Sequence, residues 1–268
     1  MSQLQALQRK IEDLRFRGFG GTAIQMHRAI YQVKLERRNL LGSLALPAVF
    51  TIVLLCLLSP IMTLWYRLFA FWIVRIAPDG QVALHQVDLG KYWLDLPYPL
   101  LPAGEPDAMT WWMTLAGCIL AYLATYLISP QRMLPLQYIT RACLLVQATA
   151  LAYFHFFPGQ FGHDPANYLS AALTMALIFL FMVPWGLGLT YYVFAFSLWR
   201  KVWLTVCMLA YFVIAFPMQY LLHAYLLQHL SLLFLPLLYL VFGIFLDVMM
   251  FVALYSWGMS WRRADARP

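Results

Sequence analysis

Charged residues are scarce in this sequence. Only 11% of its 268 residues are Asp, Glu, Lys or Arg, whereas 63% are hydrophobic. A soluble globular domain carries about 25% charged residues, so the composition excludes that class. The hydrophobic residues form successive runs of about 20 residues, which is the length that crosses a bilayer as a helix. The alternation typical of an outer-membrane barrel is missing from these runs. The sequence therefore predicts an all-α integral membrane protein.

Catalytic motifs are also missing. The sequence contains no Walker loop, no HExxH and no GxSxG motif. Its four cysteines fall inside apolar runs without the spacing of metal ligands or of a disulfide framework, and we interpret them as buried apolar side chains. General acid–base chemistry would have to rest on Asp247, or on His163 with Asp164. A non-enzymatic protein without a cofactor is therefore favoured.

Six apolar runs are predicted to cross the membrane. We expect a cytoplasmic arm at 1–42, a membrane domain at 43–258 and a cytoplasmic tail at 259–268. The spans are predicted at 43–65, 109–128, 136–157, 168–196, 202–222 and 230–257. Residues 66–76 either lie in the outer interface as an aromatic belt or continue the first span as a helix beyond the bilayer.

Basic residues predict the orientation of these spans. Eight Lys or Arg residues precede the first span. More basic residues follow the second, fourth and sixth spans, namely Arg132, Arg200, Lys201, Arg262 and Arg263. The opposite side carries only Arg67, Arg75 and Lys91. Because cytoplasmic loops are enriched in Lys and Arg, both termini are predicted to be cytoplasmic, in a bacterial-type inner membrane. The cations flank apolar runs instead of forming a phosphate-binding surface, so nucleic acid is not an expected partner.

The segment 77–108 is predicted to be an acidic external loop. It contains five acidic residues against a single basic one, Lys91. Apolar residues alternate in part from Gln81 to Leu89, and Gly90 follows, which predicts a small β-hairpin. Four prolines between Pro97 and Pro106 then predict an extended return path. We interpret this segment as an external cap without a core of its own.

The beginning of the cytoplasmic arm predicts an amphipathic helix. Four apolar residues recur there at helical spacing, Leu4, Leu7, Ile11 and Leu14. Such a helix lies on a membrane surface or docks a protein, so the expected partners are the lipid bilayer and a protein at the cytoplasmic face. The alternative is a short solvated arm that only sets the orientation.

A single acidic residue, Asp247, lies inside the predicted spans. A carboxylate there costs at least ~2.5 kcal/mol unless it faces protein or water. At helical spacing Asp247 shares a stripe with Gly243, while Gln137 and Arg141 share one face of the span 136–157. We expect Arg141 to reach Asp247, and this group predicts a polar pathway or gate. The alternatives are a structural buried ion pair and an arginine that snorkels to the headgroups.

Histidines are predicted to gather at the external ends of the spans, together with one aspartate. The residues are His155, His163, Asp164, His223 and His229. They could hold zinc or copper, and a pair of them could ligate haem. The alternative is a set of solvated interface histidines, because no two of them are separated by three or four residues on one helix.

The span 168–196 contains helix-breaking residues. Pro184, Gly186 and Gly188 predict a break there, which would free carbonyl groups to line a substrate or ion site. A simple kink is the alternative.

These features together favour a non-enzymatic inner-membrane subunit of a transport or export assembly, of the secretion type, that docks a cytoplasmic partner such as an ATPase. The alternative is a membrane-embedded enzyme or redox subunit that binds metal or haem through the external histidines. A stand-alone carrier that depends on Asp247 is a third hypothesis.

Overall fold

The computed structural model describes residues 37–88, 90, 93–104, 106–127, 130–157, 161–162, 164–191 and 197–260. The predicted docking residues Leu4, Leu7, Ile11 and Leu14 lie outside these ranges, as does His163. The elements in chain order are α2 (Arg37–Cys56), α3 (Leu58–Ile76), β1 (Gln81–Asp88), β2 (Trp93–Leu100), α4 (Ala108–Ala124), α5 (Pro130–Phe156), α6 (Pro165–Tyr191), α7 (Leu198–Leu230), η2 (Leu232–Phe234), α8 (Leu235–Leu240), η3 (Val241–Phe245) and α9 (Leu246–Ser260).

Three stretches of the described chain are long and apolar enough to cross a membrane. They are α6, α7 and Leu232–Gly258, which combines η2, α8, η3 and α9. Gly42–Cys56 and Leu58–Ile76 form a fourth candidate that is bent by 58°. Helix α4 is apolar but shorter, with 17 residues. The protein is therefore mostly helical, and its apolar helices place it in a membrane.

The bend between α2 and α3 follows from Pro60. Proline has no N–H, so the carbonyl of Cys56 loses its helical partner and the chain turns at Leu57, where φ is −89° and ψ is 0°. Helix α3 then covers residues 66–76. The stretch 66–76 is therefore helical.

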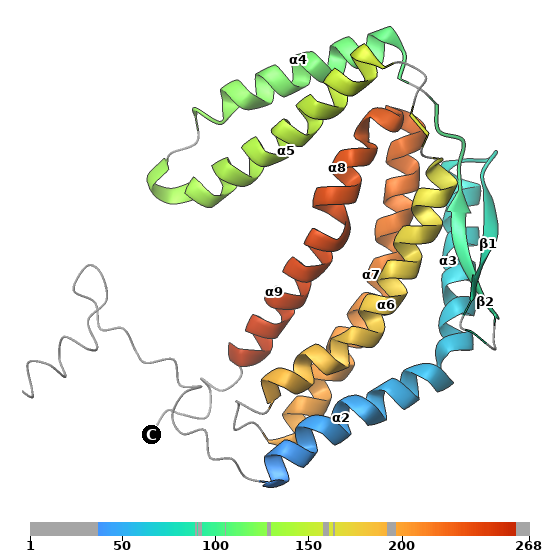
Figure 1. The fold of residues 1–268 in the computed structure, drawn as a ribbon, viewed down its shortest axis with the longest axis vertical. Coiled ribbons are helices and arrows are strands. Elements are labelled where there is room, and N and C mark those ends of the chain that lie inside the picture. The colour runs from blue at the N-terminus through green and yellow to red at the C-terminus, as the bar shows by residue number, and fades with distance from the viewer. Residues whose placement is uncertain are drawn as a thin grey trace, which may run out of the picture.

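The core lies between α3, α6 and α7, which run side by side (Figure 1). Trp65 and Phe69 of α3 are fully buried, and Nε1 of Trp65 donates a hydrogen bond of 2.8 Å to the carbonyl of Val213. Phe212 and Phe216 of α7 stack with ring centroids 5.0 Å apart. Aromatic side chains therefore fix these three helices against one another, since each buries a large apolar area.

The predicted β-hairpin is confirmed, and it is a small two-stranded addition to a protein that is otherwise mostly helical. Strands β1 and β2 pair antiparallel from Gln81 opposite Leu100 to the turn at Gly90, whose φ is +87°. Leu96 of β2 is fully buried in the same core as α3 and α6. The segment therefore packs into the core of the helices. Pro97 lies within β2, which is tolerated because both strands of a two-stranded sheet have an unpaired edge.

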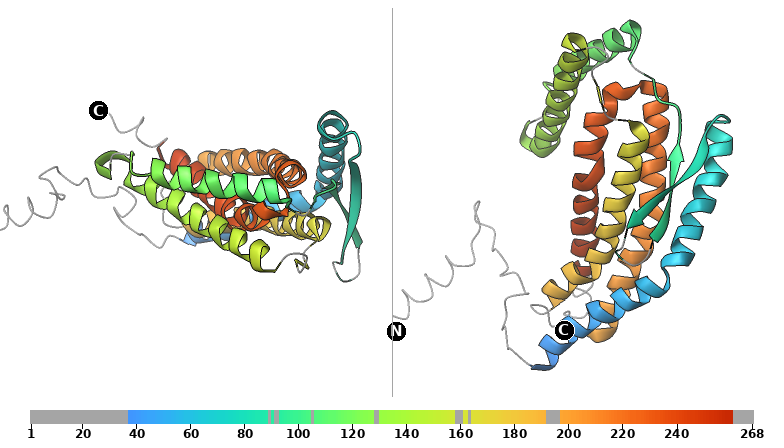
Figure 2. Two further views of the ribbon diagram at one scale, coloured as in Figure 1. Left: turned by 90° about the horizontal axis from the view of Figure 1, so that it is seen from above. Right: turned by 45° about the vertical axis from the view of Figure 1, so that its right-hand side comes forward.

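Helices α4 and α5 form a hairpin that runs obliquely to the other helices (Figure 2). It joins them at the end where α6 and α8 begin, and α5 contacts η2 and α8 there. Asp107 accepts a hydrogen bond of 2.8 Å from the backbone N–H of Thr110 and so caps α4. Hydrogen bonds from Thr110 hold the pKa of Asp107 below its usual range, so this cap stays charged at neutral pH.

Trp111 couples the two helices of this hairpin, because its Nε1 donates a hydrogen bond of 2.9 Å to the carbonyl of Leu151. We expect Trp111→Phe to lower the free energy of unfolding by about 1 kcal/mol, since one interhelical hydrogen bond is lost. The neighbouring Trp112 is 63% exposed, and Trp112→Phe should stay within about 0.5 kcal/mol of the wild type. Thermal unfolding in mild detergent measures both variants, and equal losses would contradict the assignment.

Candidate functional site between α6, α7 and the broken last helix

The last apolar stretch is broken at Gly243. The five residues of η3 form a π-helical turn between α8 and α9, and Gly243 has φ −95° and ψ −127°. Turns of this kind often occur at functional sites, because they release a carbonyl from the regular helical pattern. Here the carbonyl of Phe242 accepts a hydrogen bond from Gln219 of α7, and His223 of α7 lies beside it. The break is therefore stabilised by the neighbouring helix.

Side chains from three elements meet at this carbonyl. Nε2 of Gln219 donates a hydrogen bond of 2.8 Å to the Phe242 carbonyl, and the same amide hydrogen-bonds to the carboxylate of Asp247. His223 lies beside the same carbonyl, and its Nδ1 lies 2.9 Å from the hydroxyl of Tyr168 on α6. We call Tyr168, Gln219, His223, Asp247 and the Phe242 carbonyl the polar cluster.

Two side chains of the polar cluster are buried, whereas the hydrogen bond between Gln219 and the Phe242 carbonyl is exposed. Asp247 is 3% exposed and His223 is 2% exposed. A buried polar network is stable only when its members are satisfied, and here each has a partner on another helix or on the broken backbone. The cluster therefore joins α6, α7 and the last helix at one point.

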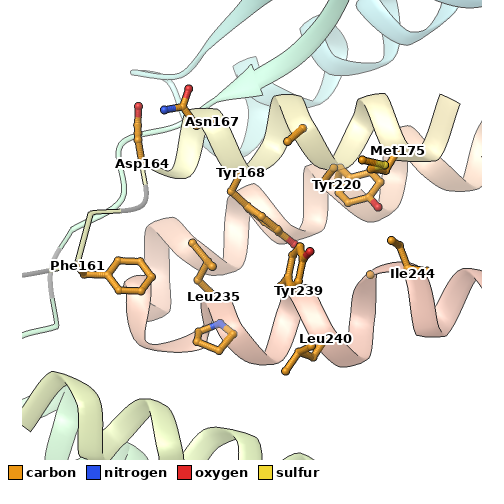
Figure 3. A pocket seen from close by; sticks show the side chains of 14 residues that line it. Phe161, Asp164, Asn167, Tyr168, Met175, Tyr220, Leu235, Tyr239, Leu240 and Ile244 are labelled. Atoms are coloured by element: carbon orange, nitrogen blue, oxygen red, sulfur yellow. The ribbon is translucent and has the colours of Figure 1, made fainter. Parts of the chain in front are cut away.

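A cavity of about 750 Å³ adjoins the polar cluster between α6 and α8 (Figure 3). Three tyrosines of its lining, Tyr168, Tyr220 and Tyr239, lie close together in the close-up view. Asp164 and Asn167 line the cavity near the start of α6. The other lining residues are apolar: Phe161, Ala171, Ala172, Met175, Leu235, Pro236, Leu240, Gly243 and Ile244. The cavity thus combines an apolar wall with a few hydrogen-bonding groups, as small-molecule sites do.

The structure does not bring Arg141 and Asp247 together. Nε of Arg141 donates a hydrogen bond of 3.2 Å to the hydroxyl of Thr125, and Gln137 donates to the carbonyl of the same residue at 3.1 Å. The guanidinium also lies over the ring of Tyr126, 5.1 Å from its centroid. Arg141 and Gln137 therefore join α5 to the end of α4, whereas the partner of Asp247 is Gln219.

This arrangement predicts no energetic coupling between Arg141 and Asp247. In a double-mutant cycle with Arg141→Met and Asp247→Asn, the two losses of unfolding free energy should add to within about 0.5 kcal/mol. Unfolding of the two single variants and the double variant in detergent measures the cycle. A coupling of several times that size would show that the ion pair forms.

The predicted histidine cluster is divided in the structure. His155 packs against Trp111, with ring centroids 5.2 Å apart, and Nδ1 of His229 lies 3.0 Å from the carbonyl of Tyr225 on its own helix. His223 belongs to the polar cluster, and Asp164 caps α6 by accepting from the N–H of Ala166. Within the described ranges, no three His, Cys, Asp or Glu side chains are grouped to hold a metal ion.

The predicted break at Pro184 is corrected, because α6 continues through it to Tyr191. The two glycines are packing positions. A Cβ on Gly188 would overlap the ring of Pro47 and lie 2.8 Å from the carbonyl of Ser43, both on α2. A Cβ on Gly186 would lie 3.2 Å from the ring of Phe251 on α9. These glycines therefore let α2 and α9 approach α6 closely.

Sequence reasoning missed Tyr168, Gln219 and Tyr220. One signal was present, since Gln219 and His223 are separated by four residues inside an apolar run and so share one face of α7. Their common target, the carbonyl of Phe242, has no signal in the sequence. No known protein family, curated protein or solved structure matches this chain.

Proposed function

We propose that this chain is a multi-pass subunit of a secretion-type transport or export assembly in a bacterial-type inner membrane, without a catalytic role of its own. The observation that carries the proposal is the α4–α5 hairpin, which is attached to the other helices at one end. None of the described residues of α4 is buried, and Met113, Leu120 and Leu123 are among its exposed apolar side chains. A hairpin of this kind is suited to pack against helices of another chain, because membrane helices associate through such faces.

In this proposal the chain has six spans, with α4 and α5 as the second and third. The start of α2, the end of α6, the start of α7 and the end of α9 lie at the same end of the molecule (Figure 1). The tip of the α4–α5 hairpin points toward that side, away from the start of α6. These are also the places where the sequence has its basic residues. Both termini and the hairpin tip would then face the cytoplasm.

The cytoplasmic arm would dock the partner in this assembly. The test is affinity purification of the full-length chain from its native membrane in mild detergent, with mass spectrometry of the co-eluting chains. We expect a stoichiometric partner that is lost from a Leu7→Asp, Ile11→Asp variant, because both substitutions place charge on the apolar face of the arm. A Gln5→Asp, Gln8→Asp variant adds the same charge to its polar side and should keep the partner.

The same purified sample also tests the alternative. A wild-type chain that elutes without a partner contradicts the assembly proposal. Stoichiometric metal or haem in that sample, measured by metal analysis and by absorption, would instead support the membrane-embedded enzyme or redox subunit.

A further inference from the structure

We infer that the cavity between α6 and α8 binds a long-chain amphiphile whose polar end is an uncharged hydroxyl group. This inference goes beyond the proposed assembly, because the site lies within one chain. It rests on the shape of the cavity, on an unpaired hydroxyl group inside it and on the charge of its lining.

The shape of the cavity fits an elongated apolar ligand. It follows one face of α6, from Asp164 to Met175, and the opposing face of α8 and η3, from Leu235 to Ile244. Ala171, Ala172 and Gly243 leave room between the two faces because their side chains are small or absent. The volume of about 750 Å³ falls within the range of about 300–1,000 Å³ that small-molecule sites have.

The hydroxyl group of Tyr220 needs a partner that the described part of the chain does not supply. The side chain of Tyr220 is 1% exposed, it lines the cavity, and its oxygen points into it (Figure 3). The rings of Tyr168 and Tyr239 approach one another with centroids 6.1 Å apart. Since the Tyr220 hydroxyl faces the cavity, a ligand hydroxyl placed among these three tyrosines would form a hydrogen bond with it.

The charge of the lining selects the polar end of the ligand. Among the described residues that line the cavity there is no Lys, Arg or His, and the single carboxylate is that of Asp164. A phosphate or carboxylate would therefore find no cation to pair with. An uncharged hydroxyl group can donate to one tyrosine and accept from another, so it fits this lining.

Photo-crosslinking of the full-length protein in nanodiscs tests the site. The probe is a long-chain primary alcohol with a diazirine in its chain, and the matched control is the carboxylic acid with the same chain. We expect the alcohol to label peptides of α6 and α8 that line the cavity, and the acid to label them at least about fivefold less. Preferential labelling of the same peptides by the acid would overturn the inference.

Three variants locate the labelling. Ala171→Trp fills the cavity from an exposed position and should remove most of the alcohol labelling. Ile178→Trp, which adds the same ring at an exposed position of α6 outside the lining, should leave it unchanged. Tyr220→Phe keeps the ring but lacks the hydroxyl, and labelling should fall by about threefold to tenfold.

Size-exclusion chromatography of each variant reports whether it is folded. If Ala171→Trp does not fold, Tyr220→Phe alone decides whether the alcohol binds in the cavity, because this substitution removes a single oxygen atom. Labelling that is unaffected by Tyr220→Phe, or that is spread evenly over the outer faces of the helices, would refute the site.

Discussion

Replacing Gly188 with alanine is expected to lower the free energy of unfolding by about 1–3 kcal/mol, which is the usual cost of overpacking. The added Cβ would overlap the ring of Pro47 and lie 2.8 Å from the carbonyl of Ser43. Neither a proline ring nor a helical carbonyl can rotate away, so α2 has to move from α6. The midpoint of thermal unfolding in mild detergent should fall by roughly 2–4 °C for each kcal/mol lost.

Gly117 provides the matched control for this substitution. It also lies in an apolar helix, and a Cβ there would meet no atom within 4 Å. Gly117→Ala should therefore be neutral or stabilise the protein by up to about 1 kcal/mol, since alanine favours the helix. If both variants lose the same stability, close packing of α2 on α6 is not the cause.

Replacing His223 with phenylalanine is expected to destabilise the protein by about 1–3 kcal/mol, because a buried donor is left without its partner. The ring is retained in shape, but the Tyr168 hydroxyl loses its hydrogen-bond partner. Unfolding in the same detergent measures the loss. His229→Phe is the control, since His229 is exposed and bonds only to its own helix, and it should change stability by less than about 0.5 kcal/mol.

A double variant separates the hydrogen bond from the general effect of changing a buried residue. Tyr168→Phe removes the hydroxyl that His223→Phe leaves unpaired. The two losses together should therefore be smaller than their sum, by about 0.5–1.5 kcal/mol. Fully additive losses would show that Tyr168 and His223 act independently and that the polar cluster is not a network.

The sequence predicts helices where apolar runs are long, and the β-hairpin where polar and apolar residues alternate. Both signals come from residues that are neighbours in the sequence. The position of a helix break depends also on residues that are distant in the sequence. Pro184 stays inside a continuous helix, whereas the break occurs at Gly243, where the Gln219 side chain of α7 binds the Phe242 carbonyl. Which helix supplies that side chain depends on tertiary packing, so sequence spacing cannot give it.

Sequence spacing also cannot identify the partners of the charged groups. The burial of Asp247 follows from its apolar surroundings in the sequence, and the structure agrees. Its partner was predicted from charge alone as Arg141, but the structure supplies the neutral amide of Gln219. Arg141 instead contacts Thr125 and Tyr126, which precede it on α4 and the following turn. Opposite charge indicates which pairs are favourable, but not which helices are neighbours.

The position of the α4–α5 hairpin tip tests the proposed six-span arrangement most directly. The measurement is labelling by a membrane-impermeant maleimide in intact spheroplasts, with the four native cysteines replaced and single cysteines placed at Ser2, Asp88 or Gln131. The account predicts that Asp88→Cys is labelled at once, and that Ser2→Cys and Gln131→Cys are labelled only after the membrane is broken. The positions of the termini alone do not distinguish six spans from four, because either number leaves both termini on the same side of the membrane. Labelling of Gln131→Cys from outside would contradict the account and leave α4 and α5 on the outer surface of a four-span protein.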